Sequence, residues 1–316
     1  MPPFSTLPRR ARGSARGVIA LTAVSAVTVL VFVPFLPLAL IKLAAPTAAL
    51  KRRMTPALIA VARVWANMLS ALFRTVSGVS IDCRGQAPQD TRGHYVLIAN
   101  HRAWTDILVL LHCVDGRLPF PRFFIKHEML RFPIVGFACW AMDFPFMRRY
   151  RKRDLARRPE LKRRDLETTR NACAKYRHQP VTVVNFAEGT RFTPAKQANT
   201  RSPYRYLLRP KAAGSGFMMQ QMADVLSGVL DVTIVYADCM QPTLWDYACG
   251  RVRRVVVSMD PLPVPKELLQ GRYEDESAVR QGFQHWMNQI WRRKDDAIAA
   301  LLDDSAADRR APARGT

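Results

Sequence analysis

The most hydrophobic stretch of the chain lies near its start. Residues 17–41 carry no charged side chain and are mostly Val, Ala, Leu, Phe and Ile. This run is longer than the ~20 residues that a membrane-spanning helix needs. Pro34 and Pro37 fall within it and predict a break or a kink. A secretory signal peptide is the competing interpretation, but the apolar region is too long, and no convincing cleavage site of small residues follows it.

Both flanks of this run are basic, so the positive-inside rule assigns no orientation to a membrane span. We expect a basic tail over 1–16 and a membrane anchor over 17–53. The anchor is either a full span or a shallow re-entrant hairpin broken at the prolines. The hairpin is the favoured form, because it returns both basic flanks to the same side.

A different pattern follows, in which apolar residues recur at steps of three and four. On one side of the resulting helix lie Leu58, Val61, Trp65, Leu69, Leu72 and Val76, and on the other lie Arg63, Asn67, Ser70 and Arg74. This spacing predicts an amphipathic helix over 54–78. The helix fits the membrane interface and packing on the next domain equally well.

From residue 79 onwards, short β-branched or apolar runs alternate with helical patterns. Strands are expected over 79–83, 95–98, 122–126, 181–186, 229–236 and 252–258. Helices are expected over 107–111, 127–142, 159–176, 214–226 and 277–302. The alternation predicts one α/β domain over 79–302, with a mixed, mostly parallel sheet flanked by helices. The small polar residues of 303–316 predict a disordered tail.

The charge balance adds a partner to this picture. Lys and Arg number 48 against 25 Asp and Glu, a formal net charge of +23. Such a charge indicates an anionic partner: nucleic acid, a phosphorylated substrate or an acidic membrane surface. Nucleic acid is not expected, because the basic residues cluster beside membrane-like segments and no nucleic-acid motif occurs. The densest basic run, 148–164, is either a solvated face or a contact with anionic lipid.

The six cysteines are scattered and form no CxxC pair. Their spacing predicts no metal site, and an even number alone predicts no disulfide framework in a chain of this length. We therefore expect reduced thiols that face the cytosol.

Candidate chemistry appears where a strand ends. His101 follows the strand at 95–98, and Asp106 comes five residues later, where a helix starts. An imidazole beside a carboxylate is the minimum that general-base catalysis requires. The alternative is structural, with Asp106 as a helix N-cap and His101 as a polar loop residue.

Charged groups also stand at other strand ends. Lys126 closes one expected strand, and Arg148 and Arg149 close a short extended piece at 143–149. Glu188 and Arg191 follow another strand. Positive side chains at adjacent strand ends can form a phosphate site.

Three ordered blocks carry a resemblance to a known family. The first is Asn-His-x4-Asp, formed by Asn100, His101 and Asp106. The second has a Lys, an acidic helix start, Pro, Gly and a final Arg: Lys126, Glu128, Leu130, Pro133, Gly136 and Arg149, or Arg148 in its place. The third is Phe-x-Glu-Gly-Thr-Arg, formed by Phe186, Glu188, Gly189, Thr190 and Arg191. Over residues 79–260 the chain thereby resembles the membrane-bound glycerolipid acyltransferases, the lysophosphatidic acid acyltransferase (PlsC-like) family.

The chain departs from this family pattern twice. Ala187 stands where the third block normally has Pro, and the fourth block, normally Val-Pro and apolar residues, is replaced by the sequence at 230–236. This form of the fourth block is similar to the lysocardiolipin-type and YihG-like branch of the family. The stretch Asp-Phe-Pro-Phe-Met-Arg-Arg-Tyr at 143–150 also resembles that branch.

The resemblance implies a general base and no acyl-enzyme intermediate. His101 would take a proton from an acceptor hydroxyl, Asp106 would orient the imidazole, and Asn100 would support the pair. The cations implied to bind the acceptor phosphate are Lys126, Arg149 and Arg191. The other implied substrate-binding residues are Glu188, Gly189 and Thr190. No metal or cofactor is implied, and the cysteines take no part.

The expected activity is transfer of a fatty acyl group from acyl-CoA or acyl carrier protein to a lysophospholipid hydroxyl. The leading acceptor is 1-acylglycerol 3-phosphate, which gives phosphatidic acid. Lysocardiolipin, lysophosphatidylglycerol and glycerol 3-phosphate are alternative acceptors, and a non-catalytic membrane protein that binds anionic lipid is the non-enzymatic alternative. The expected location is a bacterial inner membrane, with the catalytic domain on the cytoplasmic side.

Overall fold

The computed structural model describes residues 9–147, 160–271, 273 and 276–310. Its centre is a six-stranded sheet of order β1-β8-β7-β2-β6-β3, in which β7 and β8 are antiparallel and the other neighbours are parallel. The strands are β1 (Ser80–Arg84), β2 (His94–Ala99), β3 (Pro121–Phe123), β6 (Val181–Phe186), β7 (Gly228–Tyr236) and β8 (Arg254–Pro261). A separate small sheet pairs β4 (Ile125–Lys126) with β5 (Phe146–Met147). The predicted mixed, mostly parallel sheet is confirmed.

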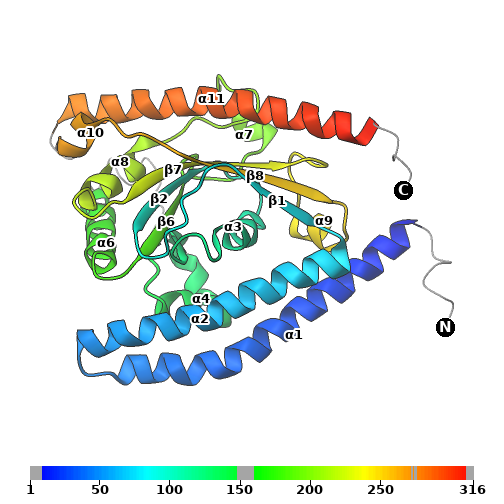
Figure 1. Ribbon diagram of the computed structural model, residues 1–316, viewed down its shortest axis with the longest axis horizontal. Coiled ribbons are helices and arrows are strands. Elements are labelled where there is room, and N and C mark those ends of the chain that lie inside the picture. The colour runs from blue at the N-terminus through cyan, green and yellow to red at the C-terminus, as the bar shows by residue number, and fades with distance from the viewer. Residues whose placement is uncertain (1–8, 148–159, 272, 274–275, 311–316) are drawn as a thin grey trace.

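Helices cover both faces of the main sheet (Figure 1). One face carries α1 (Arg9–Ala44), α2 (Ala48–Leu72), α3 (Asp106–Val114) and α4 (Pro133–Ala141). The other carries α6 (Glu160–Tyr176), α8 (Ala212–Gln221) and α11 (Ser277–Arg310). Shorter helices stand in the connections: η2 (Phe73–Ser77), η3 (His127–Arg131), α7 (Pro194–Asn199), α9 (Leu244–Ala248) and α10 (Lys266–Gln270).

The central strand β2 shows why its sequence is a continuous apolar run. Leu97 and Ala99 pack into the core beneath α1 to α4, whereas Val96 and Ile98 pack into the core beneath α6, α8 and α11. Successive side chains of a strand point to opposite faces of the sheet. Because helices cover both faces, the positions from Tyr95 to Ala99 are all buried and are apolar or aromatic, whereas His94, at the start of the strand, is half-buried.

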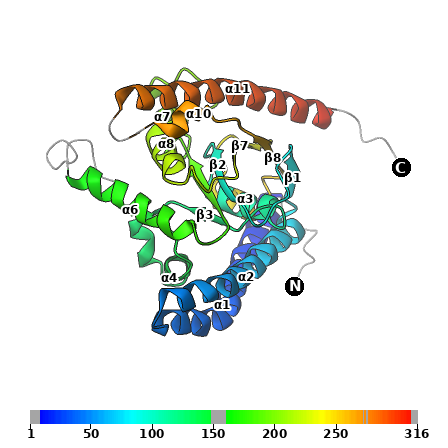
Figure 2. The ribbon, with the colours of Figure 1, turned by 60° about the vertical axis from the view of Figure 1, so that its left-hand side comes forward.

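The N-terminal helices α1 and α2 lie side by side as a two-helix hairpin (Figures 1 and 2). The helix α1 runs unbroken through Pro34 and Pro37, so the predicted break at these prolines is wrong. The chain reverses at 45–47 instead, where the Thr47 side chain caps α2 by accepting the Leu50 N–H at 3.2 Å. Packing along α2 holds α1 together where each proline removes a hydrogen bond, although an isolated helix would break there.

The predicted amphipathic helix is the greater part of α2. Its buried side is formed by Thr55, Leu58, Ala62, Ala66 and Leu69. Both hairpin helices are long and apolar enough to cross a membrane, by length and composition. In the most apolar stretch of α1 only 17% of the residues are buried, and in that of α2 only 22%. Neither is therefore surrounded by protein as a core helix would be.

The hairpin is joined to the α/β domain by a buried lysine. Lys42, near the end of α1, donates hydrogen bonds from its Nζ to the Ala141 carbonyl oxygen and to Asp143 Oδ2, both at 2.6 Å. Asp143 follows α4 and has a φ of 64°, in the left-handed region. An ammonium group buried without these partners would be costly, so the contact fixes where α1 ends relative to α4.

Two sequence predictions about segments change, and a third falls on residues that the structure does not describe. The expected strand at 122–126 is divided between β3, in the main sheet, and β4, in the small sheet. The C-terminal helix α11 continues to Arg310, so the described part of the expected disordered tail is helical. Residues 148–159, with Arg148, Arg149 and most of the basic run, lie outside the described residues.

The prediction that all six cysteines are reduced is also wrong in the structure. Cys83 on β1 and Cys113 on α3 form a disulfide. Their separation of 30 residues shows no pattern in the sequence, because the two become neighbours only when α3 packs beside β1. Four cysteines are free: Cys139, Cys173, Cys239 and Cys249.

Counting thiols tests this disulfide. Denatured protein prepared without reductant should alkylate at the four free cysteines and not at Cys83 or Cys113. The double variant Cys83→Ser, Cys113→Ser should lose about 2–4 kcal/mol of unfolding free energy, because the bond constrains the unfolded chain. Reductant should lower the Tm of the wild type and leave that of the double variant unchanged. Six labelled thiols in the unreduced wild type would contradict the bond.

Candidate active site

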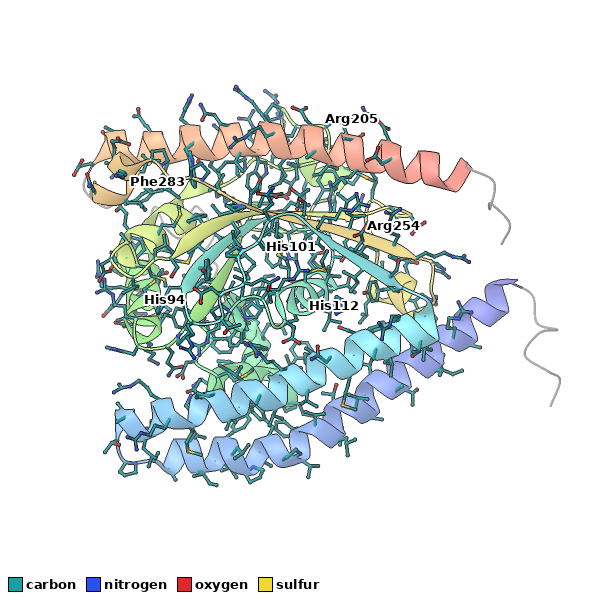
Figure 3. All side chains as sticks on the ribbon, viewed as in Figure 1. His94, His101, His112, Arg205, Arg254 and Phe283 are labelled. Carbon is teal, nitrogen blue, oxygen red and sulfur yellow. A yellow bond between two sulfur atoms is a disulfide. The ribbon has the colours of Figure 1, made fainter. Side chains whose placement is uncertain are left out.

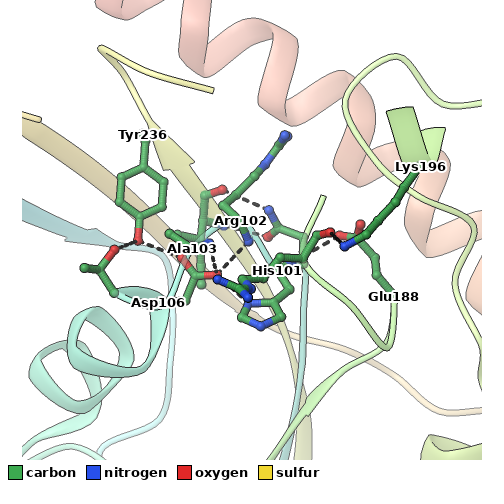
Figure 4. Close-up of polar contacts among 11 residues, drawn as sticks. His101, Arg102, Ala103, Asp106, Glu188, Lys196 and Tyr236 are labelled. Atoms are coloured by element: carbon green, nitrogen blue, oxygen red, sulfur yellow. Dashed lines mark hydrogen bonds and ion pairs between the residues drawn. The ribbon is translucent and has the colours of Figure 1, made fainter. Parts of the chain in front are cut away.

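The first block forms a His–carboxylate pair at the carboxyl end of β2 (Figure 4). His101 Nδ1 lies 2.7 Å from Asp106 Oδ2. A carboxylate oxygen only accepts, so Nδ1 carries the proton, and Nε2 is left with a lone pair. The His101 side chain is 18% exposed and that of Asp106 is fully buried. This is the arrangement of an imidazole base oriented by a carboxylate.

Asp106 is held by contacts other than those of a helix cap. Its Oδ2 also accepts the backbone N–H groups of Arg102 (2.6 Å) and Ala103 (3.0 Å), which precede α3. Its Oδ1 accepts the Tyr236 hydroxyl at 2.7 Å. The carboxylate therefore turns back onto the loop that carries His101, and the N-cap interpretation of Asp106 does not describe its contacts.

The His101 ring stacks on an aromatic ring from the third block. Its centroid lies 4.0 Å from that of Phe186, with 18° between the ring planes. Phe123, on β3, stacks on Phe186 in turn, at 6.0 Å and 14°. Figure 3 shows His101 near the middle of the molecule, whereas His94 and His112 lie elsewhere, at the start of β2 and in the last turn of α3.

Asn100 shapes the point at which the chain leaves the sheet. Its Nδ2 donates to the Ile234 carbonyl oxygen at 2.9 Å, and its Oδ1 accepts the Ile234 N–H at 2.8 Å. The side-chain amide thus takes the place of the backbone in pairing with β7. This frees the backbone after Ala99 to turn and present His101.

Glu188 braces the same loop from the other side. It is 1% exposed, and its two oxygens accept the backbone N–H groups of His101 (3.1 Å) and Leu208 (3.0 Å). Burial raises the pKa of this carboxyl to about 7, against the lowering effect of these two hydrogen bonds. Its oxygens bind the backbone of two loops, so Glu188 holds these loops together.

The rest of the third block forms a tight turn. Gly189 has a φ of +68°, a region that favours glycine. Thr190 Oγ1 accepts a hydrogen bond from Lys196 Nζ at 2.8 Å, and the Arg191 carbonyl oxygen accepts one from the same ammonium at 2.9 Å. The Arg191 guanidinium lies 4.9 Å from the ring centroid of Trp104, so the first and third blocks meet.

The second block is less closely joined to this site. Lys126 is exposed and belongs to the small sheet, not to the strand beside β6. Arg149 and its alternative Arg148 lie outside the described residues. Of the three cations predicted to hold phosphate, only Arg191 is described beside the residues of the first block.

Two site residues were missed from the sequence. Tyr236 is 130 positions from Asp106 in the sequence. The one sequence feature that could have indicated its role is its position at the end of β7, the strand beside β2. Arg102 is buried, and its guanidinium lies 4.6 Å from the Phe192 ring centroid. Burial lowers the pKa of Arg102, while the charges of Glu188 and Asp106 oppose that shift. No pattern in the sequence marks an arginine between His101 and Asp106 as buried.

An apolar pocket lies between the hairpin and the α/β domain. Its empty volume is about 660 Å³, the open part included. It is lined by Val31, Phe32 and Phe35 of α1, Val61 and Trp65 of α2, Ile107 and Leu111 of α3, and Ile134 and Ala138 of α4, among others. Phe123 also lines it, so the stacked rings of Phe123 and Phe186 connect the pocket wall to His101.

No metal centre is evident in the part of the chain that the structure describes, where no three His, Cys, Asp or Glu side chains come together as ligands. The six residues 100, 101, 106, 188, 190 and 191 form a site with an imidazole–carboxylate pair and one cation, Arg191. Such a site can move a proton at one atom and attract an anion beside it.

Comparison with known proteins gives a family match and a similar fold. The family model described as Acyltransferase matches residues 80–237, which is half of the chain. No curated protein matches the chain. The fold is similar to the crystal structure of the 1-acyl-sn-glycerophosphate (LPA) acyltransferase, PlsC, from Thermotoga maritima. The TM-score is 0.55 over 93% of this chain and 98% of that chain, and the sequences are 14% identical. Identity at this level shows a shared fold.

The pH dependence of stability should report on Glu188. Its pKa is about 7 in the folded protein, above the ordinary 4.5, so the folded state holds the proton more tightly than the unfolded state. The contribution of this carboxyl to the unfolding free energy therefore falls as the pH rises from 4.5 to about 7, by about 3 kcal/mol in total. Chemical unfolding from pH 4.5 to 8 should show this fall in the wild type and a flatter profile in Glu188→Gln. Parallel profiles for the two proteins would contradict the raised pKa.

Proposed function

The chain belongs to the Acyltransferase family, and we propose that it transfers a fatty acyl group from acyl-CoA or acyl carrier protein to a hydroxyl of a lysophospholipid. The leading acceptor is 1-acylglycerol 3-phosphate, which would give phosphatidic acid. The observation that carries the proposal is the 2.7 Å contact between His101 Nδ1 and Asp106, which leaves Nε2 as a base. The similar fold of an acyltransferase for this acceptor supports the choice.

The proposed reaction proceeds in one chemical sequence on the acceptor. His101 Nε2 takes the proton of the acceptor hydroxyl while the hydroxyl oxygen attacks the thioester carbonyl carbon. The tetrahedral intermediate collapses, the C–S bond breaks, and the imidazolium returns its proton to the leaving thiolate. Asp106 stabilises the imidazolium between the two proton transfers. No acyl-enzyme forms, because the acceptor itself is the nucleophile.

General-base help of this kind contributes about 10²–10⁴ in rate. The remainder has to come from the placement of the two substrates and from donors for the oxyanion. The loops that carry Asn100 and Glu188 are held in place, because each of these side chains forms two hydrogen bonds to backbone groups. Rigid loops of this kind can hold the two substrates in a fixed position. The substrate-binding roles of Lys126, Arg149, Gly189, Thr190 and Arg191 belong to this proposal.

The apolar pocket is the proposed site of an acyl chain. It is partly open and is lined almost entirely by apolar side chains. Phe123, one of its lining residues, stacks on Phe186, and Phe186 stacks on His101. An acyl chain in this pocket is removed from water where it contacts the lining, which favours binding in proportion to the area covered. The depth of the pocket would then set the preferred chain length.

A membrane is the proposed partner of the hairpin. Val33 of α1 is 66% exposed, Phe132 beside the start of α4 is 59% exposed, and Trp140 of α4 is 47% exposed. Exposed large apolar residues recur along α1 from Val18 to Leu43, and an extended apolar surface of this kind marks an interaction site. Trp is enriched where membranes meet water. The proposed location is a bacterial inner membrane, with the α/β domain on the cytoplasmic side.

A second acceptor class follows from the sequence at 230–236, which resembles the lysocardiolipin-type branch. Lysocardiolipin and lysophosphatidylglycerol carry phosphodiesters in place of the terminal phosphate. An acceptor panel that includes these lipids separates the two classes.

The decisive test is an acyl-transfer assay on membranes. Labelled acyl-CoA is offered with a panel of lysophospholipids to the wild type and to His101→Ala. The wild type should acylate at least one acceptor, and the variant should lose at least 10²-fold in rate because the general base is absent. Co-sedimentation with vesicles should be equal for the two proteins, since His101 lies away from the hairpin surface. Wild-type turnover by His101→Ala would refute the mechanism.

The pocket proposal has its own test. Ala138→Phe adds a ring inside the pocket and should shift the preference of the enzyme towards shorter acyl donors. Val64, on the exposed side of α2, offers a matched control: Val64→Phe should leave the chain-length profile unchanged. Competition among acyl-CoA species of increasing length measures the shift. An unchanged profile in Ala138→Phe would argue that the chain binds elsewhere.

A further inference from the structure

The turn after β6 gathers cations that the acid–base pair does not use. Arg191 lies against Trp104, and Lys196 is hydrogen-bonded to Thr190 and to the Arg191 carbonyl. A third cation, Lys211, reaches the same turn from the segment before α8. None of the sequence motifs includes Lys211.

The position of Lys211 is set at its backbone and at its side chain. Its N–H donates to the Ala187 carbonyl oxygen at 2.8 Å, which fixes it at the end of β6. Its side chain then lies over Gly189: Nζ is 3.3 Å and Cδ is 3.4 Å from the position that a Cβ at 189 would occupy. A side chain at 189 would crowd this ammonium group, so the glycine admits Lys211 to the turn.

Glu188 forms no ion pair with Arg191 or with Lys211. The nearest acid in the sequence, Glu188, is buried and directs both oxygens to backbone N–H groups. Within the described part of the chain, neither Arg191 nor Lys211 forms an ion pair. Lys211 is exposed. Two cations that share a turn without a counter-charge offer a site for an anion from solution.

The Thr190 hydroxyl adds a donor to the two cations. Its oxygen accepts the hydrogen bond from Lys196 Nζ at 2.8 Å, so its own proton is free to point towards a ligand. A guanidinium, an ammonium and a hydroxyl are the kinds of donor that bind a phosphate group, whose oxygens accept several charge-assisted hydrogen bonds.

We propose that Lys211, with Arg191 and Thr190, binds the acceptor phosphate and selects a terminal phosphomonoester over a phosphodiester. The proposal rests on the proposed function for its substrate and adds a residue that determines specificity. A phosphomonoester has three unesterified oxygens and a charge between −1.5 and −2 near pH 7. A phosphodiester has two such oxygens and one charge, so it gains less from a further ammonium.

The kinetic test compares two acceptors in mixed micelles. For Lys211→Met, the apparent KM for 1-acylglycerol 3-phosphate should rise about tenfold, the size expected when one charge-assisted hydrogen bond is lost. The KM for lysophosphatidylglycerol should change about twofold or less, and kcat should change little for both. Lys211→Arg should retain most of the discrimination. Lys266→Met is the matched control, because Lys266 is an exposed lysine that begins α10, and α10 contacts the other end of α8.

The pH profile adds a readout that a structural role would not move. As the phosphomonoester loses its second proton, near pH 6, its KM should fall in the wild type and fall less in Lys211→Met. Equal changes in KM for both acceptors, or no change, would overturn the role of Lys211 and leave the acyltransferase proposal intact.

A binding measurement separates the inference from the activity. His101→Ala, with and without Lys211→Met, is titrated with each lysophospholipid in the same micelles. Tighter binding of the phosphomonoester that depends on Lys211 supports the inference even if the wild type fails to acylate it, in which case only the proposed activity fails. Binding that is indifferent to Lys211 overturns the inference.

Discussion

The Asp106 carboxylate accepts hydrogen bonds from the His101 ring, from two backbone N–H groups and from the Tyr236 hydroxyl, and it has no exposed surface. A charge buried without such partners would cost several kcal/mol. The donors come from the loop after β2 and from the end of β7, and the acceptor begins α3. The chain therefore cannot place α3 on the sheet without also orienting the imidazole, and fold and site depend on the same contacts.

The neighbouring loops are fastened by the same means. Asn100 pairs with the backbone of β7, and Glu188 joins the backbone of His101 to that of Leu208. Each of these side chains satisfies backbone groups that would otherwise be unpaired at the end of a strand. Three strand ends are thereby held at fixed distances, which is the placement that transfer between two bound substrates requires.

Local patterns made the centre of this site predictable. His101 and Asp106 are five residues apart at the junction of a strand and a helix, and the apolar runs of β2, β6 and β7 mark buried strands. Contacts between distant segments were not predictable. Tyr236 meets Asp106, Cys83 meets Cys113, and α1 survives its two prolines, only because the fold brings partners together. For Lys126 the local pattern was misleading. The apparent strand at 122–126 is divided between two sheets, so Lys126 belongs to the small sheet and not to the strand beside β6.

The N-terminal hairpin has a consequence for any attempt to study the α/β domain by itself. Side chains of α1 and α2 form one wall of the apolar pocket, and Lys42 fastens the end of α1 to the segment after α4. A fragment that begins at residue 79 would lose that wall and leave Phe123, Ile107 and their neighbours facing water. Removing the hairpin to gain solubility would therefore expose apolar core and dismantle a substrate site in the same step.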